Sequence, residues 1–186
     1  RNDFSSARLC RLLENGDLVL APGPSGTPLA ARTACRHLRS AMIGWKRDRY
    51  LARLRALREA RAADLARVDK GAGEDGAEVD EVRRDALAAA IAEIDDLSAG
   101  VGRLLAAFPG PDGNNRYGIQ ALCEAFAALL GRCGRADTDF DRKAREVLHG
   151  RLAEIGEEGR RPALALSEAL DLLRTTGASL RVGASP

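Results

Sequence analysis

Apolar residues recur three or four positions apart over most of this chain, which is the spacing that places them on one face of an α-helix. A first run extends from about residue 29 to residue 68, without proline and with Gly44 as its single internal glycine. The glycine-rich segment 69–76 interrupts the pattern, and a second run covers about residues 77–108. Its apolar positions are spaced like the seam of a coiled coil: Leu87, Ile91, Ile94, Leu97, Val101, Leu104 and Phe108.

Two long helices joined by a short glycine-rich loop are expected to fold back as an antiparallel hairpin, because each then buries the apolar stripe of the other. The second helix carries most of the acids that could answer the arginines of the first. Counting outward from a tip near Gly73 predicts three ion pairs between the helices: Arg61 with Asp85, Arg67 with Asp80 and Arg53 with Glu93.

Shorter amphipathic segments follow the proline- and glycine-rich loop 109–115, and they predict three helices over 119–133, 139–155 and 162–175. The N-terminal residues 1–28 are irregular in pattern, with one short helix expected near residues 4–13. We therefore predict an all-α fold with an N-terminal arm at 1–28, a helical bundle at 29–176 and a loose tail at 177–186. The bundle combines the long hairpin, 29–68 and 77–108, with the three shorter helices.

The stretch "LVLAPGPSGTPLAART", residues 18–33, has the outline of a strand, a glycine-rich loop and a helix start, as in a phosphate-binding loop. Such a loop needs glycine, lysine and a hydroxyl residue at its last three positions. Counted from Gly23, those positions hold Pro28, Leu29 and Ala30, which supply none of these groups. We interpret the stretch as a turn in which Thr27 caps the next helix and Pro28 is its first residue.

Composition changes this picture only locally. The chain has 29 basic and 27 acidic residues among 186, with arginine far in excess of lysine, and its net charge of +2 excludes a protein that is basic throughout. A basic surface is instead expected at the end of the hairpin opposite its tip, since residues 98–108 contain no acid. Carboxylates of the three C-terminal helices covering this surface are the alternative. The predicted partner-binding residues there are Arg32, Arg36, Arg39, Trp45, Lys46, Arg47, Arg49 and Tyr50.

Catalytic and metal-binding patterns are missing from the sequence. His37 and His149 stand on different predicted helices, without the repeated acid and histidine spacing of a di-iron bundle. The four cysteines lack the spacing of a zinc site, so we expect buried thiols, with an oxidised Cys123–Cys133 pair as the alternative. We therefore predict a protein that is not an enzyme and that binds no metal or cofactor. The sequence contains no apolar run of 18 residues, the length that a membrane span needs.

The leading functional prediction is a structural or accessory subunit of a large multi-protein assembly, in which the arginine-rich hairpin mediates protein–protein interaction. A respiratory, ATP-synthesising or photosynthetic complex is the expected setting, with the mitochondrion preferred to the cytoplasm. The chain begins at Arg1 and not Met, which a cleaved transit peptide or simple trimming would explain. One alternative is a peripheral ribosomal protein that binds RNA through the same basic surface, and anionic lipid is another ligand for it. A further alternative is a bacterial helical effector or regulator.

Overall fold

The computed structural model describes residues 5–44, 46–71, 77–134, 136–157 and 163–179. Within these residues it contains helices and no strand, which confirms the predicted all-α class. The chain divides into two compact units, Arg1–Leu105 and Ala106–Pro186, and each unit is considered by itself. The helices are α1 (Ser6–Glu14), α2 (Ala31–Ser40), α3 (Arg49–Gly71), α4 (Ala77–Ala106), α5 (Ile119–Cys133), α6 (Asp139–Glu157) and α7 (Leu166–Ser179).

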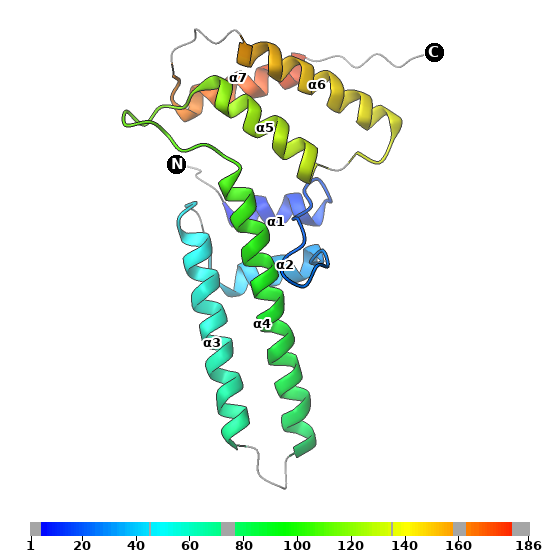
Figure 1. Cartoon of the computed structure of the whole chain (residues 1–186), viewed down its shortest axis with the longest axis vertical. Coiled ribbons are helices and arrows are strands. Elements are labelled where there is room, and N and C mark those ends of the chain that lie inside the picture. Colours follow the sequence, from blue (N-terminus) through cyan, green and yellow to red (C-terminus); the bar gives the residue numbers. More distant parts are fainter. Residues whose placement is uncertain (1–4, 45, 72–76, 135, 158–162, 180–186) are drawn as a thin grey trace. The chain divides into compact units, whose positions relative to one another are not determined.

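In the first unit, α3 and α4 lie side by side as the two arms of the predicted hairpin (Figure 1). The second arm agrees closely with the prediction, but the first arm is not one helix from 29 to 68. The chain leaves the helix after Ser40 and re-enters it at Arg49, and α2 runs at a steep angle to α3 (Figure 1). Met42 and Lys46 have φ angles of 50° and 79° in this break. Such left-handed residues cannot continue a right-handed helix, so the connection turns the chain.

Buried apolar side chains from three helices form the core of the first unit. Each of α2, α3 and α4 contributes side chains with at most 1% of their surface exposed: Cys35, Leu38, Tyr50, Leu54, Ile94, Leu97 and Val101. Helix α1 lies within the predicted arm and adds Leu9, Cys10 and Leu13 to the buried set. The arm is thus partly helical, as expected, and its helix is packed into the unit.

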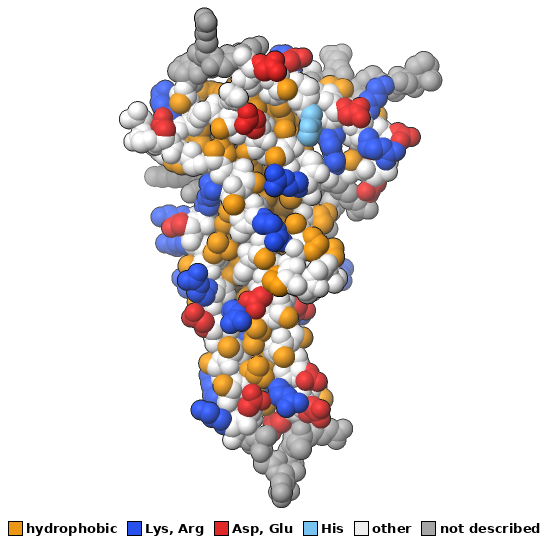
Figure 2. Space-filling view, viewed as in Figure 1, with side chains coloured by type: hydrophobic (Ala, Val, Ile, Leu, Met, Phe, Trp, Pro, Cys, Tyr) orange, Lys and Arg blue, Asp and Glu red, His pale blue; other side chains and the backbone are white. Residues whose placement is uncertain are grey.

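Toward the tip of the hairpin the apolar seam is only half-covered. Leu57 and Leu65 of α3 and Leu87 and Ile91 of α4 are half-buried, while Val82 is 68% exposed. Figure 2 shows apolar side chains along the hairpin with charged side chains at its margins. Two helices alone can shield only the line along which they touch, so this part of the hairpin has little core of its own.

The ion pairs across the hairpin differ from the predicted ones. Arg58 Nε lies 2.7 Å from Asp95 Oδ1, about six residues further along α4 than counting from the tip predicts. Arg61 and Arg67 instead pair with Asp64 in their own helix. The reason is geometric: side chains lean toward the N-terminus of their own helix, which is the base of the hairpin for α3 and the tip for α4. Side chains that meet therefore come from positions that are not opposite each other along the backbone.

The stretch 18–33 is a turn, as predicted, but the helix begins at Ala31, so the proposed capping by Thr27 and Pro28 is wrong. The turn is fixed by contacts with α4 instead. The Ser25 backbone N–H donates to Asp96 Oδ1 at 2.9 Å, and Gly23 lies directly against the Asp96 backbone. The N-cap residue of α2 is Ala30, which offers no side-chain cap, and the Asp96 carboxylate satisfies a backbone N–H of the preceding turn instead.

The second unit packs α5, α6 and α7 around a small core. Ile119, Leu122, Cys123, Leu152, Ile155 and Ala169 are its buried members. Tyr117 and Leu164 exchange two backbone hydrogen bonds, of 2.8 and 3.0 Å, which join the segments before α5 and α7. The predicted bounds of α5 and α6 agree with the structure to within two residues, whereas α7 begins and ends four residues later than predicted. Pro162, the predicted first residue of that helix, lies outside the described residues, as does most of the predicted tail.

The contact between Gly23 and α4 predicts a strong effect of a single methyl group. A Cβ atom at Gly23 would lie 2.3 Å from the Asp96 Cα atom, whereas one at Gly44 would meet no atom within 4 Å. We expect Gly23→Ala to lower the free energy of unfolding by about 1–3 kcal/mol, the usual cost of overpacking. Gly44→Ala is the control and should stay within about 0.5 kcal/mol of the wild type. Urea denaturation of both variants measures this, and equal stabilities would contradict the packing of the turn on α4.

The Asp96 carboxylate also predicts a pH dependence of stability. Hydrogen bonds from the side chain and backbone of Ser25 lower the pKa of this carboxyl below its usual value. The stability that this shift contributes is complete above the unfolded-state pKa of about 4, and it is lost as the pH falls through the lower folded-state pKa. The difference in free energy of unfolding between wild type and Asp96→Asn should therefore shrink on acidification from pH 6 to below pH 4. Exposed Asp85, changed to Asn, serves as the control; a constant difference for Asp96→Asn would refute the shift.

Candidate functional site

Two of the predicted binding arginines are engaged inside the first unit. Arg36 Nη2 lies 2.8 Å from Glu93 Oε2, and Arg39 Nη2 lies 2.8 Å from Glu14 Oε1. Both guanidinium groups remain more than 60% exposed, so they still contribute to the positive potential of the surface. Each nevertheless forms an ion pair, Arg36 with Glu93 of α4 and Arg39 with Glu14 of α1. The expectation that the hairpin offers no partner for this end is therefore wrong for Arg36.

Glu93 connects α4 to α2 through a second contact that the sequence did not suggest. The same Oε2 atom that receives Arg36 lies 2.7 Å from His37 Nε2, and the His37 side chain is only 7% exposed. A buried imidazole nitrogen needs a partner, and this carboxylate supplies it. Sequence counting assigned Glu93 to Arg53, because it ignored the direction in which side chains lean along the two helices.

Tyr50 and Arg47 also have internal roles. Tyr50 has no exposed surface, and burial raises the pKa of its phenol to about 12. Its ring therefore belongs to the core, and the predicted contact with a partner is wrong for this residue. Arg47 is half-buried, and its Nη2 donates to the backbone carbonyl of Leu105 at 2.5 Å. Trp45, the other predicted aromatic contact, lies outside the described residues.

The remaining predicted cations stay exposed. Arg32 is the second residue of α2. Lys46 and Arg49 lie together where the chain enters α3. The Arg49 backbone N–H donates to the Lys46 carbonyl at 3.2 Å, which fixes these two residues beside each other. Within the described part of the chain, none of these three side chains forms an ion pair.

Two residues that the prediction did not include join this exposed group. Arg53 follows Arg49 by one helical turn, so both side chains occupy one face of α3. Met42 lies in the strained connection before α3 and is 78% exposed, with a φ angle of 50°. We name Met42, Lys46, Arg49 and Arg53 the connector surface.

The electrostatics of the connector surface favour anions. The first turn of α3 contains no acidic residue, although a helix N-terminus carries partial positive charge that acids usually offset. Basic side chains there add to the field of the helix, and Asp48 is the single acid in the sequence from residue 41 to residue 58. A strained backbone, an exposed methionine and uncompensated cations are together unfavourable for folding, and such features concentrate at binding sites.

The described residues include no cluster of three side chains suited to a metal ion. The cysteines are free thiols: burial raises the pKa of Cys35 to about 12 and also raises the pKa values of Cys123 and Cys133. Thiols with raised pKa values are poor nucleophiles at neutral pH. Nor does any described helix have the length and apolar character required to cross a bilayer.

Comparison of the chain with known protein families, with curated proteins and with solved structures finds no match. The function is therefore argued from the geometry of the chain alone.

The internal role of Glu93 yields a direct test. Glu93→Ala leaves the buried His37 nitrogen and the Arg36 guanidinium without their carboxylate, so we expect the free energy of unfolding to fall by about 1–3 kcal/mol. Asp85→Ala removes an exposed acid that counting from the tip assigned to Arg61, and it should change stability by less than about 0.5 kcal/mol. Chemical denaturation distinguishes the two variants. A larger loss for Asp85→Ala would restore the register predicted from the sequence.

Proposed function

We propose that this chain is a non-catalytic accessory subunit of a multi-protein assembly, and that it binds an acidic surface of a neighbouring protein through the connector surface. The supporting observation is the contrast between the two groups of cations in the first unit. Arg36 and Arg39 have carboxylate partners inside the unit, whereas Lys46, Arg49 and Arg53 have none among the described residues. Met42, in the connection before α3, adds an exposed apolar side chain, and uncompensated charge together with exposed apolar surface is typical of a protein interface.

A protein partner is preferred to RNA on three observations. Met42 offers an exposed, adaptable apolar contact, which suits a protein surface better than a phosphate backbone. Tyr50, one of the two predicted aromatic contacts, is buried and therefore not available to stack on a base. The net charge of +2 is also low for a protein that holds RNA mainly through phosphates. The identity of the assembly and its cell compartment stay predictions from the sequence.

Charge reversal on the connector surface tests this function. The triple change Lys46→Glu, Arg49→Glu and Arg53→Glu should weaken association with the native assembly at least tenfold, because three attractive contacts become repulsive. Stability should change little, since these side chains are exposed and make no ion pair in the described part of the chain. Sedimentation of tagged protein in a gentle cell extract measures association, and loss of binding leaves a 19.8 kDa chain near the top of the gradient.

The matched control reverses three other exposed arginines of the same unit, Arg8, Arg83 and Arg84, and should sediment with the assembly like the wild type. Ribonuclease treatment of the extract completes the design. A particle that survives the nuclease and loses only the connector variant supports a protein partner. Release of the protein by ribonuclease would indicate that the connector surface binds RNA. Equal sedimentation of the connector variant and the control would contradict the assignment of the connector surface as the binding site.

A further inference from the structure

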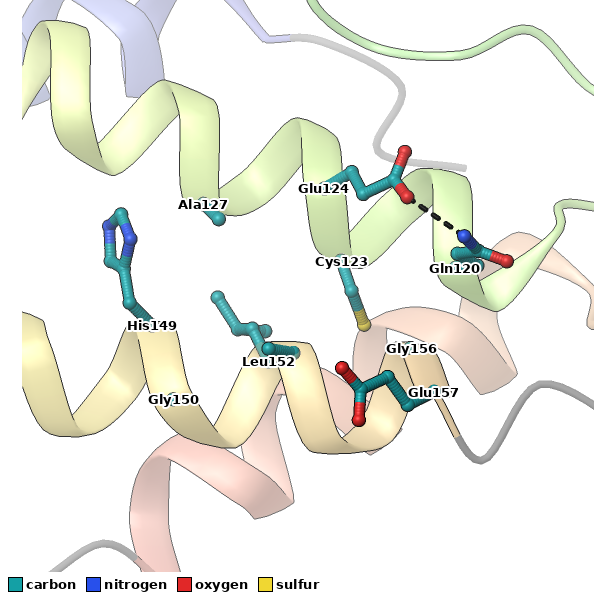
Figure 3. Close-up of a pocket in the computed structure, with 10 residues that line it drawn as sticks. Gln120, Cys123, Glu124, Ala127, His149, Gly150, Leu152, Gly156 and Glu157 are labelled. Atoms are coloured by element: carbon teal, nitrogen blue, oxygen red, sulfur yellow. Dashed lines mark hydrogen bonds between the residues drawn. The ribbon is translucent and has the colours of Figure 1, made fainter.

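The second unit contains a groove between α5 and α6 that the proposed function does not use. Its volume is about 550 Å³, and its lining residues recur at helical spacing on both sides: 120, 123, 124 and 127 on α5, and 149, 150, 153, 156 and 157 on α6. Each side therefore presents about two helical turns, close to 10 Å of length. Figure 3 shows the two helices facing each other, with the side chains of His149 and Leu152 extending from α6 toward α5.

The floor of the groove is made of small and apolar residues, and one of them has no explanation inside the chain. Gly150 lies in the interior of α6, where glycine costs roughly 0.5–1 kcal/mol relative to alanine. A Cβ atom at Gly150 would find no other atom within 4 Å, so no neighbour in this protein requires the glycine. By contrast, a Cβ at Gly156 would contact Cys123 and Gln120 at 3.8 Å. Gly150 is thus an exposed position of the lining beside which the chain itself leaves space for another group.

Polar groups of the groove indicate the chemistry of an occupant. Glu124 on α5 and Glu157 on α6 are exposed carboxylates, and the described residues that line the groove include no lysine or arginine. Gln120 Nε2 donates to Glu124 Oε1 at 3.0 Å, which holds this carboxylate at the margin (Figure 3). At the other end, the His149 Nε2 atom is buried and has no hydrogen-bond partner within the described structure. A buried nitrogen of this kind is normally satisfied, so a polar group from outside would complete it.

We propose that this groove binds an amphipathic helix of a partner protein, with a face of small and apolar residues and basic residues at its margins. Side chains spaced three and four residues apart on a third helix can fit between the rows of side chains that α5 and α6 present at the groove. The open position at Gly150 permits a close approach of its backbone, and its basic residues complement Glu124 and Glu157. This inference does not rest on the connector surface, because it concerns the other unit and a ligand of opposite charge.

A designed pair of peptides tests the proposal on the full chain. The probe is an acetylated 16-residue helical peptide with an Ala/Leu face and lysines on both margins, and its twin has glutamates in place of the lysines. Titration followed by NMR should shift amide signals of residues 120–127 and 149–157, and the lysine peptide should bind at least tenfold more tightly than its twin. The double variant Glu124→Lys and Glu157→Lys should reverse this preference.

Gly150→Leu provides the steric test, because it adds a bulky side chain to the groove lining at a position where a Cβ atom would meet no other atom within 4 Å. The melting temperature should stay equal or rise, since leucine is a better helix former than glycine, while binding of the lysine peptide falls at least tenfold. Ala86→Leu, at an exposed position of α4, is the matched control and should bind normally. The proposal is overturned if the lysine peptide fails to bind, if the twin binds equally, or if Gly150→Leu binds normally. Concentration-dependent dimerisation of the chain alone that Gly150→Leu abolishes would also overturn it, because the occupant would then be a second copy.

Discussion

The C-terminal half of α4 is the constraint on which the first unit depends. Within residues 93–96 it holds α2 through Glu93, α3 through Asp95, and the turn of the N-terminal arm through Asp96. The same stretch carries the buried apolar residues Ile94, Leu97 and Val101. Polar contacts with three neighbours and buried apolar residues thus alternate along this half of α4, so different faces of the helix meet different neighbours. This explains why so many specific contacts concentrate there, and why the tip half of the same helix is mostly exposed.

Charge is distributed according to the same geometry. Arginines whose side chains reach α4 or α1 are paired, as Arg36, Arg39 and Arg58 are. Those on the outward face at the start of α3 have no acid within the described residues that could reach them. Exposed ion pairs contribute little to stability, so the internal pairs mainly fix the arrangement of the helices. The uncompensated cations contribute nothing comparable to the fold, which is why we associate them with binding.

Helical periodicity predicted the fold class, the hairpin and the bounds of α5 and α6 well, because apolar spacing directly reports which face of a helix is buried. It failed at the break between α2 and α3. Met42 and Lys46 are ordinary helix formers, yet both have left-handed φ angles in the structure, which their residue types do not predict. The glycine at residue 44 was the local signal, but a single glycine is also compatible with a continuous helix. Tertiary packing decided between the two.

The predicted binding residues fared unevenly for a similar reason. Residue type and helical spacing drew attention to a basic region, but neither shows which side chains are buried. Tyr50 looked like an interface ring and is a core residue, whereas Met42 carried no sequence signal and is widely exposed. The groove between α5 and α6 was not predicted at all. Gly150 and His149 stand out only in the structure, because a Cβ atom at Gly150 would have no neighbour within 4 Å and the buried His149 Nε2 has no hydrogen-bond partner among the described residues.

The central claim is that the connector surface touches a protein neighbour, and site-specific photo-cross-linking tests it most directly. A benzophenone amino acid at residue 42 reports contacts of the connector surface, and the same group at residue 82, also exposed, reports the tip half of the hairpin. The account predicts a cross-link from residue 42 to one defined protein, insensitive to ribonuclease and abolished by charge reversal at Lys46, Arg49 and Arg53, with none to that protein from residue 82. Cross-links from residue 82 alone, or from residue 42 to RNA, would contradict it.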